Sequence, residues 1–208
     1  MILIGQYDSP FVRRVGIALT LAGISFIHRP WSVFSDGDKI APLNPLVRVP
    51  TLVLDDGETV VDSHAMIDLI EGMLGPGRAL FPQAEPARRC ALRVAGLAMG
   101  AAEKGVSLFY EHRLHEQVSQ VWSQRCRMQM EGALGVLDAD RRARPSRYWF
   151  GDALGHADIA VGCAFRFLSE AHTGLALPAR FEALAHFSAM LEDLPVFRTV
   201  SQPFVPPA

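Results

Sequence analysis

Three short segments contain residue types suited to holding a small anionic peptide. They are Ser9-Pro10-Phe11-Val12-Arg13, Arg48-Val49-Pro50-Thr51-Leu52 and Asp62-Ser63. Ser or Asp directly before a helix leaves backbone N–H groups of the first turn without intrahelical partners, and the helix dipole adds partial positive charge there. Such helix starts stabilise carboxylates and thiolates. The three segments together therefore predict a pocket for an anionic ligand that carries a thiol.

The elements that would position these segments follow the order βαβ, loop, ββα. Residues 1–6 have the length of an apolar strand, and Ser9-Pro10 predicts the start of a helix that ends near Gly23. Residues 25–28 predict a second strand. Residues 49–54 and 58–61 predict two strands around a tight turn, and Asp62-Ser63 begins a helix that Gly75-Pro76-Gly77 breaks.

The pattern changes after residue 85, where strand-like alternation disappears. Long helices are predicted over residues 86–114 and 116–142, and further helices begin near Gly155 and near Ala179. We therefore expect an α/β domain at residues 1–75, a Pro- and Gly-rich linker at 76–85 and an all-helical domain at 86–208.

The composition and charge of the chain disfavour some classes of function. The chain has 208 residues, half of them hydrophobic, a net charge of −2 and a pI near 6.4, and its basic residues form no stripe. Nucleic-acid and anionic-membrane binding are disfavoured, and neither a signal peptide nor an apolar run of about 20 residues is present, so we expect a cytoplasmic protein. Cys90, Cys126 and Cys163 are expected to be small core residues, and no spacing predicts a metal site.

The motifs and their order resemble the cytosolic glutathione transferases. The resemblance is carried by Ser-Pro-Phe-Val-Arg-Arg-Val at 9–15, Asn-Pro-Leu-Val-Arg-Val-Pro-Thr-Leu at 44–52 and Asp-Ser at 62–63. Residues 149–160 resemble the family's helix-capping segment, although Gly155 stands where the family usually places Ser or Thr. The resemblance implies a thioredoxin-like βαβ-ββα domain followed by an all-helical domain.

The resemblance also implies glutathione as co-substrate. Asp62 and Ser63 would receive its γ-glutamyl end. Val49, before a cis bond to Pro50, would pair with its cysteinyl backbone, whereas the alternative is a trans Pro50 that begins an edge strand. Phe11 belongs to the same binding segments. Arg48 would lie near the glycine carboxylate, as would Lys39, although an exposed basic residue is more often a solvated charge.

Ser9 is the predicted catalytic residue, since its hydroxyl at a helix start can donate a hydrogen bond to the bound thiolate, as in serine-type members such as the plant tau class. The alternative is that Ser9 only caps the helix. Tyr7 is the rival donor, because other classes use a tyrosine at the end of the first strand. The sequence leaves both choices open.

The second substrate would be a small hydrophobic electrophile bound between the domains. The candidate contacts are Trp31, Phe34 and the face of the first long helix that carries Ser107, Phe109, Tyr110 and His112, although each aromatic could instead serve core or dimer packing. Asp158 is interpreted as structural, since it would accept from backbone amides at the start of its own helix.

The resulting hypothesis is a homodimeric, detoxifying glutathione transferase that stabilises the thiolate and conjugates it to the electrophile. Two alternatives stay open: a glutathione-dependent isomerase or peroxidase, and a non-catalytic binding or interaction protein with the same fold.

Overall fold

The computed structural model describes residues 1–206, the side chain of Pro76 excepted. The chain forms two compact units. The first contains Met1–Leu80 together with the C-terminal segment that begins at Leu194, and the second is Phe81–Asp193.

The first unit has the predicted βαβ, loop, ββα order. Its elements are β1 (Ile2–Ile4), α1 (Pro10–Ala22), β2 (Ile27–Arg29), α2 (Gly37–Ile40), β3 (Thr51–Val53), β4 (Thr59–Val61), α3 (Ser63–Leu74), the 3-10 turn η1 (Pro76–Arg78) and α9 (Pro195–Thr199). The strands form one sheet in the order β2-β1-β3-β4, in which β1 runs parallel to β2 and antiparallel to β3, and β3 runs antiparallel to β4. This mixed sheet confirms the α/β class expected for the N-terminal domain.

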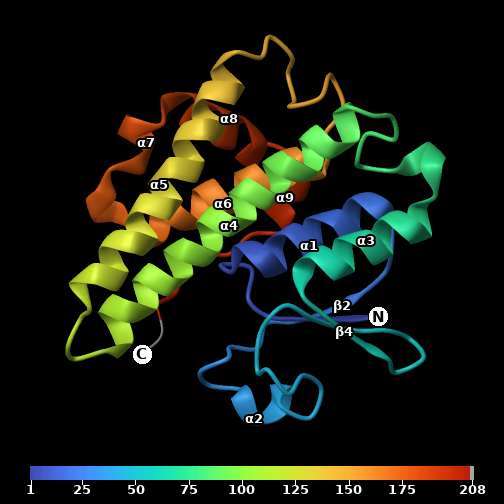
Figure 1. Cartoon of the computed structure of the whole chain (residues 1–208). Coiled ribbons are helices and arrows are strands. Elements are labelled where there is room, and N and C mark those ends of the chain that lie inside the picture. The colour runs from blue at the N-terminus through green and yellow to red at the C-terminus, as the bar shows by residue number, and fades with distance from the viewer. Residues whose placement is uncertain (207–208) are drawn as a thin grey trace. The chain divides into compact units, whose positions relative to one another are not determined.

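Helices α1 and α3 lie side by side against the sheet, with α2 on the other side of the strands (Figure 1). Proline at the first helical position and Ser9 at the N-cap begin α1, and Gly23 ends it with φ 68°. Leu3, Val15 and Met66 are fully buried, because apolar positions of the strands and of both helices recur with the period of each element.

The regular elements of the second unit are helices, as expected, beside an isolated β-bridge between Tyr148 and Gly151. Its elements are α4 (Ala87–Leu114), α5 (Gln120–Arg142), α6 (His156–Ala171), the 3-10 turn η2 (Thr173–Leu175), α7 (Leu177–Arg180) and α8 (Glu182–Glu192). Helix α4 packs against both α5 and α6. Gly105 permits a close approach of α4 to α6, because a Cβ atom there would lie 2.1 Å from Leu168 Cδ2.

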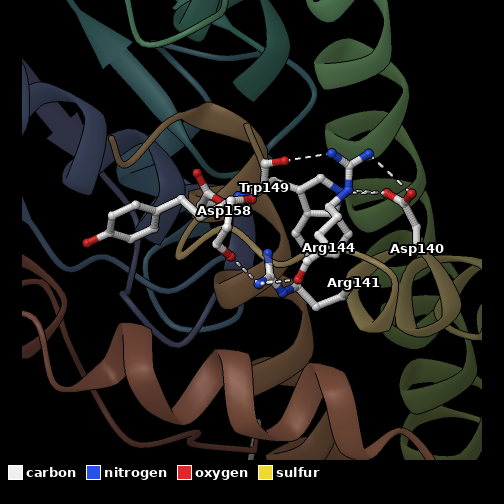
Figure 2. Close-up of polar contacts among 7 residues, drawn as sticks. Asp140, Arg141, Arg144, Trp149 and Asp158 are labelled. Atoms are coloured by element: carbon white, nitrogen blue, oxygen red, sulfur yellow. Dashed lines mark hydrogen bonds and ion pairs between the residues drawn. The ribbon is translucent and has the colours of Figure 1, made fainter. Parts of the chain in front are cut away.

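A buried polar network closes the N-terminus of α6 (Figure 2). The Asp158 carboxylate accepts from the Trp149 N–H at 2.7 Å and from the Gly155 N–H at 2.8 Å. Burial raises the pKa of Asp158 to about 6. Asp140 accepts from the Trp149 indole at 2.6 Å and pairs with Arg144, so the loop before α6 is tied to α5. The predicted contact of Asp158 with a backbone amide at the start of its own helix is confirmed.

The C-terminal segment belongs to the first unit and packs against α1. Arg13 is only 2% exposed and donates to the carbonyl oxygens of Val200 at 2.8 Å and Phe197 at 2.9 Å. Its guanidinium also lies 5.3 Å from the centroid of the Phe197 ring. The sequence grouped this segment with the helical domain at 86–208 because it lacks strand-like alternation, whereas the carbonyls of the segment serve a buried cation of the first unit.

The cysteine expectation holds for two of the three residues. Cys126 and Cys163 are buried, but Cys90 is exposed, so its assignment to the core was wrong. Cys90 lies in the first turn of α4, where Arg89 is exposed as well. None of the helices within residues 1–206 is long and apolar enough to span a membrane.

Candidate functional site

The strand register brings the three predicted segments to one edge of the sheet. Thr51 pairs with Ile4 on one side and with Val61 on the other. Pro50 therefore lies opposite both the end of β1 and Asp62, which begins α3. The start of α1, the Val49–Pro50 peptide and the start of α3 meet where β1 and β4 end and β3 begins.

Gly5 makes this convergence possible, and its role was not predicted from the sequence. Its φ is 130°, and a Cβ atom there would lie 2.5 Å from Val12 Cγ2 and 2.8 Å from Val49 Cβ. Only glycine fits between the first turn of α1 and the residue before Pro50. The Gly5 carbonyl is also held by His28 Nε2 at 2.8 Å. A glycine directly after an apolar strand was the available signal.

Ser9 occupies the N-cap of α1, with φ −69° and ψ 122°. Its Oγ accepts from the Val12 N–H at 3.4 Å, a long and therefore weak hydrogen bond. A hydroxyl has two acceptor lone pairs besides its single O–H donor. The capping contact therefore leaves the O–H of Ser9 available as a donor, and the two roles considered from sequence are compatible.

Tyr7 is held at a different place along α1. Its ring stacks on His28 with centroids 3.8 Å apart, and its Cε1 and Cζ atoms lie 2.8 and 3.3 Å from the position of a Cβ on Gly16. Gly16 is two helical turns beyond Ser9, roughly 10 Å along the axis. The phenol end of Tyr7 is thus directed at the middle of α1. Burial raises the pKa of Tyr7, so the phenol stays protonated.

Val49 precedes a cis peptide bond to Pro50, as the sequence analysis expected. Within residues 1–206, its backbone N–H and C=O have no hydrogen-bond partner. The loop that carries Val49 is fixed by Asn44, whose Nδ2 donates to the Arg48 carbonyl and to Thr51 Oγ1, both at 2.9 Å. Thr51 Oγ1 in turn donates to the same carbonyl at 2.9 Å. Asn44 and Thr51 are fully buried, so this loop is rigidly positioned.

Asp62 and Ser63 form the start of α3. Asp62 has φ 72°, which a non-glycine residue rarely adopts, and its Oδ1 accepts from the His64 N–H at 2.7 Å. Ser63 is only 3% exposed, and its backbone N–H has no partner among the described residues. The first turn of α3 therefore keeps a donor for an anion at this edge of the sheet.

The other predicted glutathione contacts lie on the same segments. Phe11 is half-buried in the first turn of α1, and Arg48 is exposed directly before Val49. Lys39 pairs with Asp36 at 2.6 Å and lies 5.9 Å from the centroid of the Trp31 ring. Lys39 thus already has an anionic partner.

The predicted acceptor contacts belong to both units. In the first unit, Trp31 is half-buried beside Lys39, and Phe34 is 48% exposed. In the helical unit, Ser107 Oγ donates to the Glu103 carbonyl at 3.0 Å, and Tyr110 makes an edge contact with Phe109. The assignment of these four residues to an acceptor site stays a prediction. In residues 1–206, no group of three or more His, Cys, Asp or Glu side chains could hold a metal ion.

The sheet order and the helices after it define a thioredoxin-like α/β unit joined to a helical unit. Residues 3–75 match the glutathione S-transferase N-terminal domain, and residues 120–189 match the glutathione S-transferase C-terminal domain. The GST-like protein YibF of Escherichia coli is 31% identical over 174 residues, which cover 81% of this chain and 82% of YibF. The chain belongs to the glutathione S-transferase family.

Two further proteins are similar to this chain over almost its whole length. Maleylacetoacetate isomerase of Mus musculus is 26% identical over 208 residues, which cover 97% of this chain and 92% of the mouse protein. The crystal structure of a glutathione S-transferase from Methylobacterium radiotolerans, in complex with glutathione sulfonate, superposes with a TM-score of 0.87 at 28% identity and covers 100% of this chain and 98% of that one.

Proposed function

We propose that this protein binds glutathione, stabilises its thiolate with Ser9 and conjugates it to a small hydrophobic electrophile. The observation that carries the proposal is the convergence at one sheet edge of a free hydroxyl donor, the open N–H and C=O of Val49 and the open N–H of Ser63. These groups match a thiolate, a peptide unit and a carboxylate. The relative from Methylobacterium radiotolerans was solved with glutathione sulfonate, which supports the same ligand class here.

In this mechanism Ser9 remains a hydrogen-bond donor throughout. The glutathione thiol loses its proton to solvent, the sulfur attacks an electrophilic carbon, and a carbon–sulfur bond forms as a leaving group departs or a double bond accepts a proton. A free thiol has a pKa of about 8.5, and lowering it by two units requires about 2.7 kcal/mol. A hydrogen bond to a charged group contributes roughly 1.5–3 kcal/mol and a helix N-terminus roughly 0.3–1 kcal/mol, which together suffice.

The geometry favours Ser9 over Tyr7 as this donor. Ser9 lies at the N-terminus of α1, where Gly5 holds Val12 and Val49 close together, whereas the phenol end of Tyr7 lies against Gly16. A thiolate bound beside Val49 would therefore be near the hydroxyl of Ser9 rather than the phenol.

Matched variants test the proposal. Ser9→Ala should raise the pKa of enzyme-bound glutathione, read by thiolate absorbance, by about one to two units, and should lower kcat/KM at neutral pH by about 10- to 100-fold. Tyr7→Phe should leave the pKa of the bound thiol unchanged. If the pKa moves in Tyr7→Phe and not in Ser9→Ala, the assignment is wrong. Absence of glutathione binding by calorimetry would remove the proposed function altogether.

Glutathione-dependent isomerisation is a second candidate, favoured by the similarity to mouse maleylacetoacetate isomerase over almost the whole chain. The same thiolate would add to a double bond, allow rotation and leave. Conjugation predicts accumulation of a thioether with aryl halides, epoxides or enones, whereas isomerisation predicts turnover of a cis-enone without consumption of glutathione. A chain that binds glutathione but does neither would be a binding protein.

A further inference from the structure

The backbone turn that leads to Ser9 determines where its hydroxyl lies. Residues 6–9 form this turn, which the Ser9 N–H closes by donating to the Gln6 carbonyl at 3.2 Å. Ser9 is both the last residue of the turn and the N-cap of α1. A side chain that acts on a bound ligand is only as well placed as the backbone that carries it. The contacts that fix residues 6–9 therefore bear on the proposed reaction.

The sheet fixes the residues that enter the turn. The Gly5 N–H donates to the Arg29 carbonyl at 2.9 Å, and the Gly5 carbonyl lies 2.8 Å from His28 Nε2. The Tyr7 ring stacks on the His28 ring with centroids 3.8 Å apart. None of these three contacts involves the backbone N–H of Tyr7 or the side chain of Asp8.

The C-terminal tail, residues 201–206, supplies the contacts to these two groups. Gln202 Oε1 accepts from the Tyr7 N–H at 3.3 Å, and the Val205 N–H donates to Asp8 Oδ2 at 3.1 Å. Residues 201–206 form neither helix nor strand, so side-chain contacts rather than a strand ladder join the tail to the turn. The Gln202 contact is long for a hydrogen bond, so we expect its effect to be modest.

The start of the tail is anchored on the same part of α1 as the turn. The Arg13 backbone N–H donates to the Ser9 carbonyl at 2.9 Å, and the Arg13 side chain donates to the Val200 carbonyl at 2.8 Å. Val200 Cγ1 and Tyr7 Cε1 lie 3.0 and 2.8 Å from the position of a Cβ on Gly16, so both side chains meet over this glycine. The tail thus leaves α1 at a fixed point directly beside the turn that it contacts.

We propose that Gln202 is a positioning residue for Ser9. By accepting from the Tyr7 N–H, Gln202 holds the turn of residues 6–9 and thereby the direction of the Ser9 hydroxyl. The inference rests on the proposed function, in which this hydroxyl donates to the glutathione thiolate. A hydrogen bond weakens steeply when its donor is misaligned, so a small displacement of the turn is enough to raise the pKa of the bound thiol.

Amide hydrogen exchange on the full chain without glutathione tests the contact itself. Gln202→Leu should speed exchange of the Tyr7 amide by at least about threefold, because the amide loses its acceptor. Gln202→Glu keeps an oxygen at this position and should preserve the protection. Gln83→Leu is the matched control, because the Gln83 side chain also bonds a backbone group, the Phe81 carbonyl at 3.0 Å, but in the second unit. Unchanged exchange of the Tyr7 amide in Gln202→Leu overturns the proposal.

The pKa of enzyme-bound glutathione, read by thiolate absorbance, tests whether Gln202 acts through Ser9. Gln202→Leu should raise this pKa by about 0.5 unit, which is a threefold smaller thiolate fraction well below the pKa. In the Ser9→Ala chain, the same substitution should raise it no further. A merely structural role would leave the pKa unmoved or shift it equally in both chains, and either result overturns the proposal.

Glutathione binding by the unsubstituted chain separates this inference from the proposed function. If the chain binds glutathione and Gln202→Leu leaves the pKa of the thiol unchanged, only the positioning role of Gln202 is wrong. If the chain binds no glutathione, the proposed function fails, and the positioning role fails with it.

Discussion

Asn44 is the residue through which the fold positions Val49, although it would not touch the ligand. Its side-chain amide donates twice, to the Arg48 carbonyl and to Thr51 Oγ1, and its Oδ1 accepts from the Leu46 N–H at 3.0 Å. Asn44→Ala should therefore raise the KM for glutathione by about three- to tenfold and should change kcat less. The free energy lost from the positioning of Val49 is about that of one hydrogen bond. Steady-state kinetics with varied glutathione measures both constants.

Asn44→Asp is the informative companion variant, because it keeps the acceptor for Leu46 but loses both donors. It should show the same increase in KM as Asn44→Ala. A loss of thermal stability with unchanged KM in both variants would mean that Asn44 serves folding alone.

Asp158 predicts a specific pH dependence of stability. Burial raises its pKa from the ordinary 3.8 to about 6, so the folded state binds this proton more tightly than the unfolded state. The contribution of Asp158 to stability is therefore fully present below about pH 4 and is lost as pH rises through 6. Asp158→Asn should be more destabilised relative to the parent chain at pH 5 than at pH 7, by on the order of 1–2 kcal/mol in urea unfolding. An equal difference at both pH values would show that the pKa is not raised.

Among single residues, the sequence predicted the roles that depend on adjacent residues. It did not predict the roles that depend on residues distant in the sequence. Ser9 and Gly23 at the ends of α1 could be predicted because a helix cap is determined by adjacent residues. Gly5 could not, since its need for glycine arises from Val12 and Val49, which only the folded sheet brings close. The φ of 72° at Asp62 was likewise not visible in the residue type.

Helices α5 and α7 are joined by a charged cluster that titrates in acid. Glu131 accepts from both Nη atoms of Arg180, at 2.7 and 2.9 Å, and from Arg127 Nε at 2.8 Å. The hydrogen bond from Arg180, aided by Arg127, lowers the pKa of Glu131 to about 2. The stabilisation is therefore present above about pH 4.5 and is lost as pH falls toward 2.

Glu131→Gln should accordingly be less stable than the parent chain at pH 7, by up to about 1 kcal/mol, as for a partly exposed ion-pair network. The difference should shrink as pH falls below 4 and should also shrink in high salt. Glu103→Gln is a suitable control, because among residues 1–206 the Glu103 carboxylate pairs only with the adjacent Lys104, at 3.3 Å. A difference that stays constant from pH 7 to pH 3 would contradict the lowered pKa.

Element order could be predicted more reliably than element limits. The helix predicted from residue 116 begins only at Gln120, because Ser119 is the residue that caps it by accepting from the Trp122 N–H. The strand predicted over residues 49–54 is reduced to Thr51–Val53, since Val49 and Pro50 are not part of the strand ladder. In both cases the sequence period was correct, but only the start of α5 was decided by a local polar contact.

At the scale of the whole molecule, the first unit is not contiguous in sequence. The segment that begins at Leu194 returns to α1, where Phe197 is fully buried and Val200 is 2% exposed. The prolines at 195, 203 and 206 distinguish this segment from the helices before it, but none of its residue types shows that it packs against α1. The sequence shows that Arg13 is basic, but only the structure shows that its acceptors are the carbonyls of residues far along the chain.

Homodimer formation, which we infer from the family resemblance, also concerns the whole molecule. Met73 on α3 and Leu92 on α4 are 46% and 45% exposed, and large apolar side chains on the surface favour contact with another chain. Sedimentation at micromolar concentration should show a dimer. A monomer at that concentration would contradict the inference, and Met73→Lys and Leu92→Lys would show which of the two surfaces is responsible.

The return of the chain to α1 predicts a strong coupling between the C-terminal segment and Arg13. Truncation after Asp193 leaves the buried Arg13 guanidinium without the Phe197 and Val200 carbonyls, and removing one partner of a buried charge costs about 3–5 kcal/mol. Arg13→Met in the full chain loses the same contacts but leaves no buried charge. The two changes should therefore be far from additive in urea unfolding, with the truncated Arg13→Met chain more stable than the sum predicts. Additive losses would mean that the segment stabilises the first unit through Phe197 packing alone.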